Sequence, residues 1–523
     1  MFFNKNKGSY LATLGKGVVA SCSMALIVGC QTLGPDYLTP DAPIRSEWSE
    51  VSSEISSKKE ISEKTDYDKW WLVFDDEVLN SLVETAKAQN HSLKIAGVRI
   101  LEAKARLGIA TGNKYPQQQQ LRAGLLKKGL SENSANFSSS LDTSYLDNNV
   151  GLDIGWELDV WGRFKRGIEA ADADMLASVA DYDDVMVRLV SSVALTYTQV
   201  RTLEERLYIA KSNVTIQTDS LRVAAARLEN GVTTELDVFQ AKTLLLNTQA
   251  TIPALEVELQ KSLHALSVLL GVPPGNLQLE LARKLPIPVA PVDVAVGIPA
   301  ELLRRRPDIK RAELQTAAQS ARIGIAEAEL YPHFTLTGSI GLRSSDTFDS
   351  HLSDLFHSDS IETFVGPSLT WNIFNYGRIK NNVRVQDARL QQLIVAYQRT
   401  VLESLQEVED AIVGFVRAKE QVAFFRESSV MARRSVDLSL IQYRDGAVNY
   451  QRVLDSQKTL ASQQDLYVSS RGNVAVNLIQ LYKALGGGER VESQKNFIQD
   501  PTYQQMGERT DWGGLITDSP LAR

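Results

Sequence analysis

The sequence predicts a mainly α-helical protein that also carries four β-strands of the membrane type and is built from two copies of one unit. Three observations predict this fold. A tryptophan-containing motif occurs twice at a fixed spacing. Each copy of the motif ends a stretch in which apolar and polar residues alternate. Each copy is also followed by a long segment without proline, residues 163–229 and 378–445.

The internal repeat keeps nearly the same distance between matching residues along almost the whole chain. We therefore use it, before any local pattern, to divide the chain. Helices rich in alanine and leucine resemble one another by chance, but chance does not keep their spacing constant. We place repeat 1 at residues 90–271 and repeat 2 at residues 306–486. The landmarks, 215 or 216 positions apart, are residues 156–163 and 371–378, residues 105–110 and 321–326, Gly231 and Gly446, and Leu270 and Leu485.

Residues 1–29 have the organisation of a secretory signal peptide, with lysines followed by a short apolar run. The run ends at Gly29-Cys30, which resembles the lipobox of bacterial lipoproteins. We expect cleavage before Cys30 and an acyl chain such as palmitate on this residue. Cys22 fits less well, because few apolar residues separate it from Lys16. A plain signal peptide with an incidental cysteine is the alternative.

Three segments flank the repeats. Residues 30–89 are expected to hold the lipid anchor and an N-terminal segment, after which Asn90 caps a helix. Residues 272–305 form a proline-rich linker, and residues 487–523 form a polar tail. The linker ends in three consecutive arginines, residues 304–306, which we expect to form structural ion pairs rather than a nucleic-acid site.

Four strands are expected, at residues 116–128, 148–160, 332–344 and 363–375. Their apolar residues alternate with polar ones over roughly ten positions, which is the length and pattern of a strand in a membrane barrel. A half-buried soluble sheet is the alternative. Aromatic residues near the strand ends favour the membrane, because such rings gather at membrane interfaces. They are Trp156, Trp161, Trp371 and Tyr376.

The proline-free segments predict two helices, each about 100 Å long at 1.5 Å per residue. Asn230-Gly231 and Asp445-Gly446 have the chemistry of left-handed helix ends. Thr234 and Asp237 have the spacing of a capping box that starts a returning helix. Each repeat is therefore expected to contain a helical hairpin. Pro253 lies inside the first returning helix and is expected to kink it.

Four strands cannot close a membrane barrel, because single-chain bacterial barrels have at least eight. Open strand edges are not tolerated in lipid. If the strands span a membrane, several copies must share one barrel. Two copies would supply eight strands and three would supply twelve. Such an assembly is a conduit whose helices extend from one side of the membrane.

With these motifs in order, the chain resembles the TolC/OprM-type outer-membrane efflux channels, in particular the lipoprotein, NodT-like branch that serves resistance-nodulation-division (RND) pumps. The resemblance covers residues 30–488. The motifs that carry it are Gly29-Cys30, residues 34–40, Trp70-Trp71-x-x-Phe74-x-Asp76, residues 302–309, Tyr331-Pro332 and the two tryptophan motifs.

The resemblance implies a homotrimer in the outer membrane, with a twelve-stranded β-barrel continued by a periplasmic tunnel of long α-helices. It implies a passive exit duct for drugs or other small molecules, and hence a part in antibiotic resistance. The implied partners are a periplasmic adaptor, an inner-membrane RND transporter and outer-membrane lipid. The alternatives are a duct for type I protein secretion and a structural surface lipoprotein.

The resemblance also implies where the duct closes, namely at the tips of the hairpins. A ring of three carboxylates there would favour cations. The implied gate residues are Asp455, Gln451, Arg452, Tyr443 and Arg444. The implied adaptor-contacting turns contain Arg227, Gly231, Thr233 and Gly446.

Enzyme signatures are absent from the sequence. Gly486-Gly487-Gly488 lacks the lysine of a phosphate-binding loop. His351 and His357 lie in a polar loop without the spacing of a metal site. The formal net charge of −7 and the lack of a basic block argue against a nucleic-acid partner. We therefore expect no enzyme activity, no cofactor and no metal.

Overall fold

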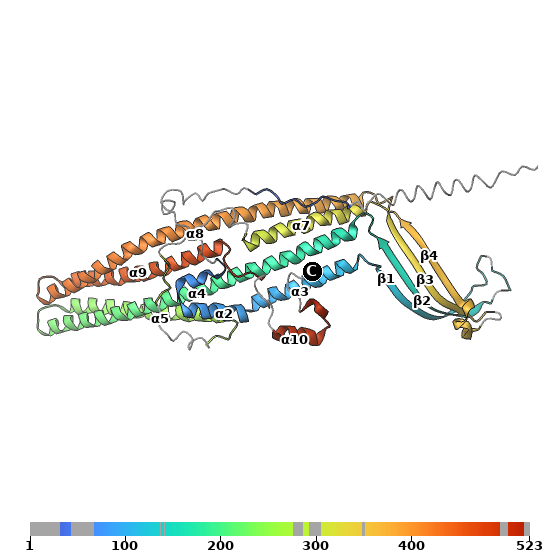
Figure 1. Ribbon diagram of the computed structural model, residues 1–523. Coiled ribbons are helices and arrows are strands. Elements are labelled where there is room, and N and C mark those ends of the chain that lie inside the picture. The colour runs from blue at the N-terminus through green and yellow to red at the C-terminus, as the bar shows by residue number, and fades with distance from the viewer. Residues whose placement is uncertain are drawn as a thin grey trace, which may run out of the picture. The chain divides into compact units, whose positions relative to one another are not determined.

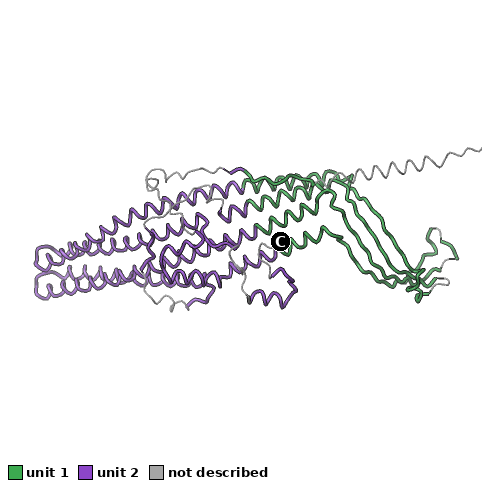
Figure 2. The backbone as a smooth tube through the Cα atoms, viewed as in Figure 1, with its two compact units in different colours: residues 1–40, 103–176, 313–395 green, residues 41–102, 177–312, 396–523 purple. Residues whose placement is uncertain are grey.

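A computed structural model describes residues 32–42, 67–135, 137–140, 142–275, 286–291, 305–347, 351–491 and 500–516. The signal peptide and Cys30 lie outside these residues. The chain divides into two compact units, and each draws segments from both repeats (Figure 2). Unit 1 comprises residues 1–40, 103–176 and 313–395, and unit 2 comprises residues 41–102, 177–312 and 396–523.

Unit 1 contains one antiparallel sheet in the order β1-β2-β3-β4 (Figure 1). The first two strands are β1 (Gln118–Gly129) and β2 (Ser144–Leu158), and the last two are β3 (His333–Ser345) and β4 (Ile361–Thr370). Three helices adjoin the strands: α3 (His91–Gly112), α7 (Pro307–Ala328) and, after Ser345, the short η3 (Leu352–Phe356). A second short helix, η4 (Ser358–Ser360), precedes β4.

Two strand boundaries differ by more than two residues from those expected. The second strand begins at Ser144 rather than at residue 148, because Asp147 is held by cations on both neighbouring strands. The fourth strand ends at Thr370 rather than at residue 375. Its chain turns there, since the Ile373 N–H bonds back to the Trp371 carbonyl at 3.1 Å. Trp371 therefore lies beyond the strand.

The two strand pairs of the repeats have the same register. Gln118 pairs with Gly155, and adding 215 to both numbers gives the observed pair of His333 with Thr370. One face of the sheet is apolar and exposed. Leu121 and Val365, for example, are each 79% exposed on this face. Such a face needs a cover, and lipid supplies one in a membrane barrel.

The tryptophan motifs join strand ends to helix ends. The Trp156 indole donates to the Lys114 carbonyl at 3.2 Å, just after α3. The Trp371 indole donates in the same way to the Leu330 carbonyl at 3.0 Å, just after α7. Carbonyls at a helix C-terminus lack partners within the helix, so each tryptophan satisfies one of them. The repeated motif thus makes the same contact twice.

The described N-terminal segment, residues 32–40, is a strap held along the start of α4 (Arg163–Glu229) and along α7. The Leu33 N–H donates to the Trp161 carbonyl at 3.1 Å, and Arg166 donates to the Leu33 carbonyl at 2.9 Å. A Cβ on Gly162 would lie 2.8 Å from Thr32 Cγ2, and one on Gly324 would lie 2.5 Å from the Leu33 oxygen. The strap passes this closely only because both positions are glycine.

Unit 2 consists of helices. The long pair α4 and α8 (Arg378–Arg444) contribute their later parts to it. The returning helices are α5 (Glu235–Leu269), which continues through Pro253, and α9 (Tyr450–Ala484). Smaller helices are η1 (Tyr67–Phe74), α2 (Glu77–Gln89), α10 (Asp500–Arg509) and η6 (Gly513–Leu515).

The main core of unit 2 surrounds Trp70 and Trp71, which are almost fully buried. The first residues of α2 and α3 are both capped, those of α3 by Asn90 as expected from the sequence. Asp76 accepts from the Val78 and Leu79 N–H groups, and Asn90 accepts from the Leu93 N–H at 3.0 Å.

The end of the arginine run is a structural ion pair, as expected. Arg306 is buried and donates to Asp308 at 2.7 Å, to Glu407 at 2.8 Å and to the Ala484 carbonyl at 2.7 Å. Burial alone would raise the pKa of Asp308, but the hydrogen bond and charge of Arg306 outweigh it and hold this pKa below the usual 3.8. The pair therefore stabilises the fold at neutral pH and loses its effect only in strong acid.

Gly324→Ala should displace the strap, because its new Cβ would meet the Leu33 oxygen and the Arg166 side chain. We expect a loss of about 1–3 kcal/mol of stability, measured by thermal unfolding, together with faster proteolysis of residues 32–40. Gly108→Ala is the matched control, since this repeat 1 glycine has no atom within 4 Å of an added Cβ. Equal effects of both substitutions would contradict a specific contact between strap and Gly324.

Candidate functional site

The two turns that join the helices of each hairpin in unit 2 have the same backbone conformation. Gly231 and Gly446 have φ values of +68° and +76°, which glycine adopts without strain. The Val232 N–H donates to the Arg227 carbonyl at 2.9 Å, and the Ala447 N–H donates to the Gln442 carbonyl at 2.8 Å. This pattern is the Schellman motif, so both helices end as the sequence predicts.

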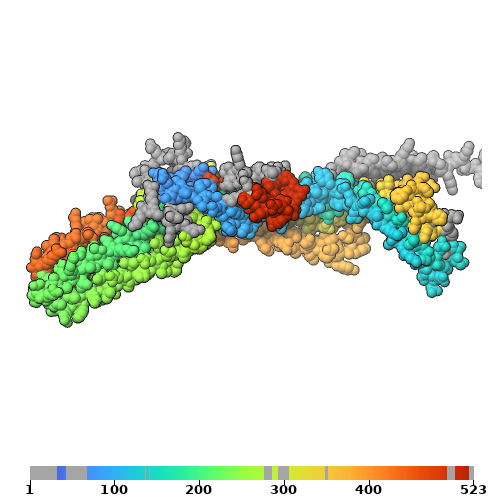
Figure 3. Space-filling model, turned by 90° about the horizontal axis from the view of Figure 1, so that it is seen from below, coloured from blue at the N-terminus to red at the C-terminus, as the bar shows by residue number. Residues whose placement is uncertain are grey.

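The two turns lie side by side at one end of unit 2 (Figures 1 and 3). Arg227 joins them, because its guanidinium donates to the Arg444 carbonyl at 2.8 Å and stacks over the Tyr443 ring at 4.7 Å. The Tyr443 hydroxyl donates to Asp237 at 3.1 Å. The second turn is therefore fastened to the first by one cation and one phenol.

A small apolar core supports this contact. The Tyr443 and Tyr450 rings meet edge to face with centroids 5.2 Å apart, and the Tyr450 hydroxyl lies 3.0 Å from Ser220 Oγ. Burial raises the pKa of both tyrosines above its usual value. The hydroxyl of Tyr443 thus remains protonated and able to donate. The other core residues include Ala224, Ala241, Leu244, Val453 and Leu454.

The capping box expected between Thr234 and Asp237 at the start of α5 does not form. Thr234 stands at the N-cap but its side chain caps no N–H group. Instead the Thr233 hydroxyl donates to Asp237, the carboxylate that also accepts from Tyr443. Asp237 therefore accepts both from the turn before its own helix and from the opposite hairpin.

The expected gate residues divide into two groups. Asp455 and Gln451 lie together on an exposed face of α9, where the Gln451 amide donates to Asp455 at 2.9 Å. Arg452 is also exposed there. Tyr443, in contrast, is buried, and Arg444 takes part in the contact between turns through its carbonyl.

Tyr450 and Ser220 belong to the site although sequence reasoning did not select them. They are 230 positions apart, so no local pattern links them. The one available signal in the sequence is a second aromatic residue seven positions after Tyr443, just after the glycine turn.

The strap bears on the expected lipid site. Thr32, two positions after Cys30, lies against Gly162 at the junction between β2 and α4, and its hydroxyl accepts from Lys165 at 3.2 Å. Cys30 itself lies outside the described residues, and the described chain begins at Thr32.

Within the described ranges, no group of three or more histidine, cysteine, aspartate or glutamate side chains could hold a metal ion. None of the helices in those ranges has both the length and the apolar character needed to cross a membrane.

The sequence matches the family model described as outer membrane efflux protein twice, over residues 82–272 and 298–487. It is 30% identical over 477 residues to the pyoverdine export outer membrane protein OpmQ of Pseudomonas aeruginosa, covering 90% of this chain and 98% of that protein. It is also 30% identical over 470 residues to the probable outer membrane lipoprotein SilC of Salmonella typhimurium, covering 88% and 96%. The fold resembles the outer-membrane channel OprN, with a TM-score of 0.80, 30% identity and coverage of 88% and 99%.

Tyr443→Phe should loosen the contact between the turns, because it removes the hydrogen bond to Asp237 and keeps the ring. The expected local cost is about 1 kcal/mol, seen as faster amide hydrogen exchange in residues 227–237 and 443–455. Tyr208→Phe is the control, as this tyrosine is 69% exposed on α4. Unchanged exchange in the Tyr443 variant would show that the hydroxyl does not hold the turns together.

Proposed function

The chain belongs to the family of outer membrane efflux proteins, and on that premise we propose how this outer-membrane channel works. It is a passive exit duct through which an inner-membrane pump expels small molecules. The family is one of channels rather than enzymes. The observation that carries the proposal is the joining of four amphipathic strands to two long helical hairpins in one chain.

The duct is proposed to be a homotrimer. The sheet has two edges, β1 and β4, and an exposed apolar face. Three copies would supply twelve strands, enough for a membrane barrel with a water-filled interior. The hairpins of the three copies would then form the wall of the periplasmic tunnel.

The tip of the tunnel is proposed to be its gate. Asp455 and Gln451 are exposed on α9 directly after the second turn, where three copies would bring three carboxylates together. Arg452 and Arg444 are exposed beside them. The fastening of Arg227 and Tyr443 between the turns would resist opening, so a partner that separates the hairpins must break it.

The proposed partners are a periplasmic adaptor and an inner-membrane RND transporter. Glycine turns expose their backbone, and Gly231 and Gly446 are both exposed. Next to the first turn, Val232 and Leu236 are exposed apolar side chains. Such residues, with Thr233 and Arg227, suit a docking surface for an adaptor at the tip.

Asp455→Ala should change ion flow through the reconstituted protein. In planar bilayers the wild type is expected to form pores that prefer cations, because carboxylates attract them. The variant should lose part of that preference. Asp219→Ala, which removes an exposed acid elsewhere on α4, should not. Absence of any pore would contradict the channel itself, while equal selectivity of all three proteins would remove Asp455 from the gate.

Cys30→Ala should abolish labelling of the protein by radioactive palmitate in cells, because the acceptor thiol is lost. Cys22→Ala should leave labelling unchanged, since this residue lies within the segment expected to be cleaved. Labelling that follows Cys22 instead would move the anchor and the start of the mature chain.

A further inference from the structure

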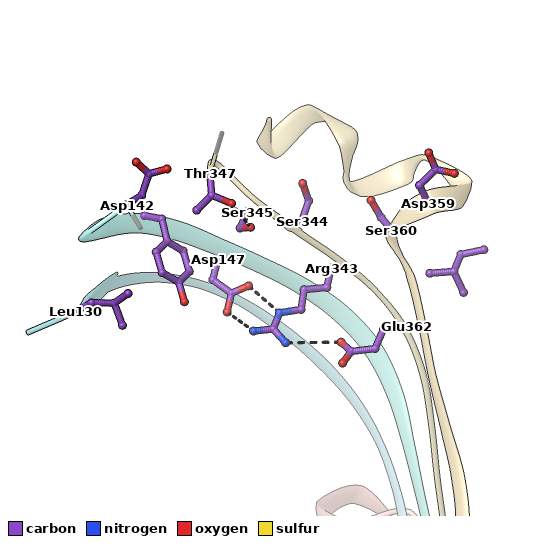
Figure 4. Close-up of a pocket in the computed structure, with 12 residues that line it drawn as sticks. Leu130, Asp142, Asp147, Arg343, Ser344, Ser345, Thr347, Asp359, Ser360 and Glu362 are labelled. Carbon is purple, nitrogen blue, oxygen red and sulfur yellow. Dashed lines mark hydrogen bonds and ion pairs between the residues drawn. The ribbon is translucent and has the colours of Figure 1, made fainter. Parts of the chain in front are cut away.

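Four charged side chains form a ladder across the sheet, one from each strand. Figure 4 shows three of them, Asp147, Arg343 and Glu362. Lys128 on β1 pairs with Asp147 on β2. Arg343 on β3 holds Asp147 with two hydrogen bonds of 2.9 Å and lies 3.8 Å from Glu362 on β4. The signs alternate along the ladder as base, acid, base, acid. Asp147, Arg343 and Glu362 line an open depression of about 490 Å³ at one end of the sheet.

The ladder lies on the polar face of the sheet. Lys128 points to the same face of β1 as Arg122, because the two are an even number of residues apart. Asp147 likewise shares a face of β2 with Asp153. Arg122 and Asp153 also form an ion pair across the two strands at 3.5 Å. In a membrane barrel the polar face lines the interior. The ladder begins with a cation on one edge strand and ends with an anion on the other.

The internal repeat indicates which residue should pair with Glu362 beyond the edge of β4. The register of β1 with β2 becomes that of β3 with β4 when 215 is added to both residue numbers. The same shift turns Asp147 into Glu362, and its reverse turns Arg343 into Lys128. The counterpart of the contact between Asp147 and Arg343 is therefore a contact between Glu362 and Lys128. Within one copy these two residues are on opposite edges of the sheet.

We infer that β4 of one copy pairs antiparallel with β1 of the next copy in the register of β2 with β3, so that Glu362 meets Lys128 of the neighbouring copy and the ladder closes into a ring of alternating charges. This inference rests on the proposed shared barrel. The ring contains as many acids as bases, so it adds no net charge to the interior. A two-residue slip of the strands would separate Glu362 from Lys128, so the ion pairs select the register.

A separate contact at the other end of the strands points to the same seam. Within one copy, the Trp161 indole donates to the Pro332 carbonyl at 2.8 Å and its ring packs 4.7 Å from that of Tyr331. The counterpart of Trp161 is Tyr376, which is fully exposed in a single copy and has a φ of +49°, unusual for a residue with a side chain. The counterpart of Tyr331 is Tyr115, which is also exposed.

The seam between copies therefore brings Tyr376 against Tyr115 of the neighbouring copy. The edge strands are thus marked at both ends, by an ion pair at one and by two aromatic rings at the other. Both contacts have a counterpart inside the chain, and both are incomplete without a second copy.

Cysteine cross-linking tests the register. Asp153 lies directly opposite Ser339 in the sheet, and the shift of 215 makes Ser368 and Gly124 the counterpart pair between copies. Both residues are small and lie on the polar face. The double variant Gly124→Cys with Ser368→Cys should form covalent dimers and trimers on oxidation in outer membranes. Arg122→Cys with Ser368→Cys, displaced by two residues, should not. Single variants control for Cys22 and Cys30.

Charge reversal tests the ion pair. Glu362→Lys should lower the temperature at which trimers dissociate in mild detergent, and Glu362→Gln should lower it less, because only the former places like charges together. Asp359→Lys makes the same charge change at an exposed residue outside the ladder and should have a smaller effect.

The outcomes separate this inference from the proposed function. Trimers by mass that fail to cross-link, or that cross-link in the displaced pair, overturn the register while the shared barrel stands. Trimers that tolerate Glu362→Lys as well as Asp359→Lys overturn the ion pair. A monomeric mass, near the 57.8 kDa of the full chain, would overturn the shared barrel and with it the inference.

Discussion

The unpaired edges of the sheet are the constraint on which the rest of this structure depends. A membrane offers no water to satisfy the backbone N–H and C=O groups of an edge strand, so every strand in it must be paired on both sides. Here β1 and β4 each have one partner within the chain. A single copy is therefore an incomplete membrane protein, and its shape as a channel exists only in an assembly of copies.

The two repeats make the same local contacts in different surroundings. Both place a tryptophan on a helix end and both end their long helix at a glycine. They differ where the strap lies. Arg166, which holds the strap, corresponds to Asn381, and Gly324, which the strap crosses, corresponds to Gly108 with open space around it. The boundary between repeat 1 and repeat 2 inside the chain is covered by the strap. The matching boundary, next to the edge strands β4 and β1, would be completed by a neighbouring copy in the inferred assembly.

Local chemistry explains which parts of the fold could be predicted from the sequence. Alternation of apolar residues indicated all four strands, and the glycines at 231 and 446 indicated both helix ends, because these signals act over a few residues. The early end of β4 at Thr370 could not be predicted, since it depends on a backbone turn without a distinctive residue. The family resemblance, rather than periodicity, supplied the gate residues.

The site at the turns was less predictable because its contacts join distant parts of the chain. Asp237 has the spacing of a capping residue, and only the approach of Tyr443, 206 positions away, assigns it to the opposite hairpin. The link from Arg227 to the Arg444 carbonyl involves a backbone acceptor, which no side-chain pattern can reveal. Sequence thus indicated where the turns are and not how they are fastened.

The strap has a consequence for the order in which parts of the chain fold. Its residues contact Gly162 and Arg166 from repeat 1 as well as Ser320 and Gly324 from repeat 2. It can settle only after the two repeats have come together, although it precedes both of them in the sequence. The strap is thus expected to dock late in folding, and its contacts with both repeats mark a copy whose two halves are correctly joined.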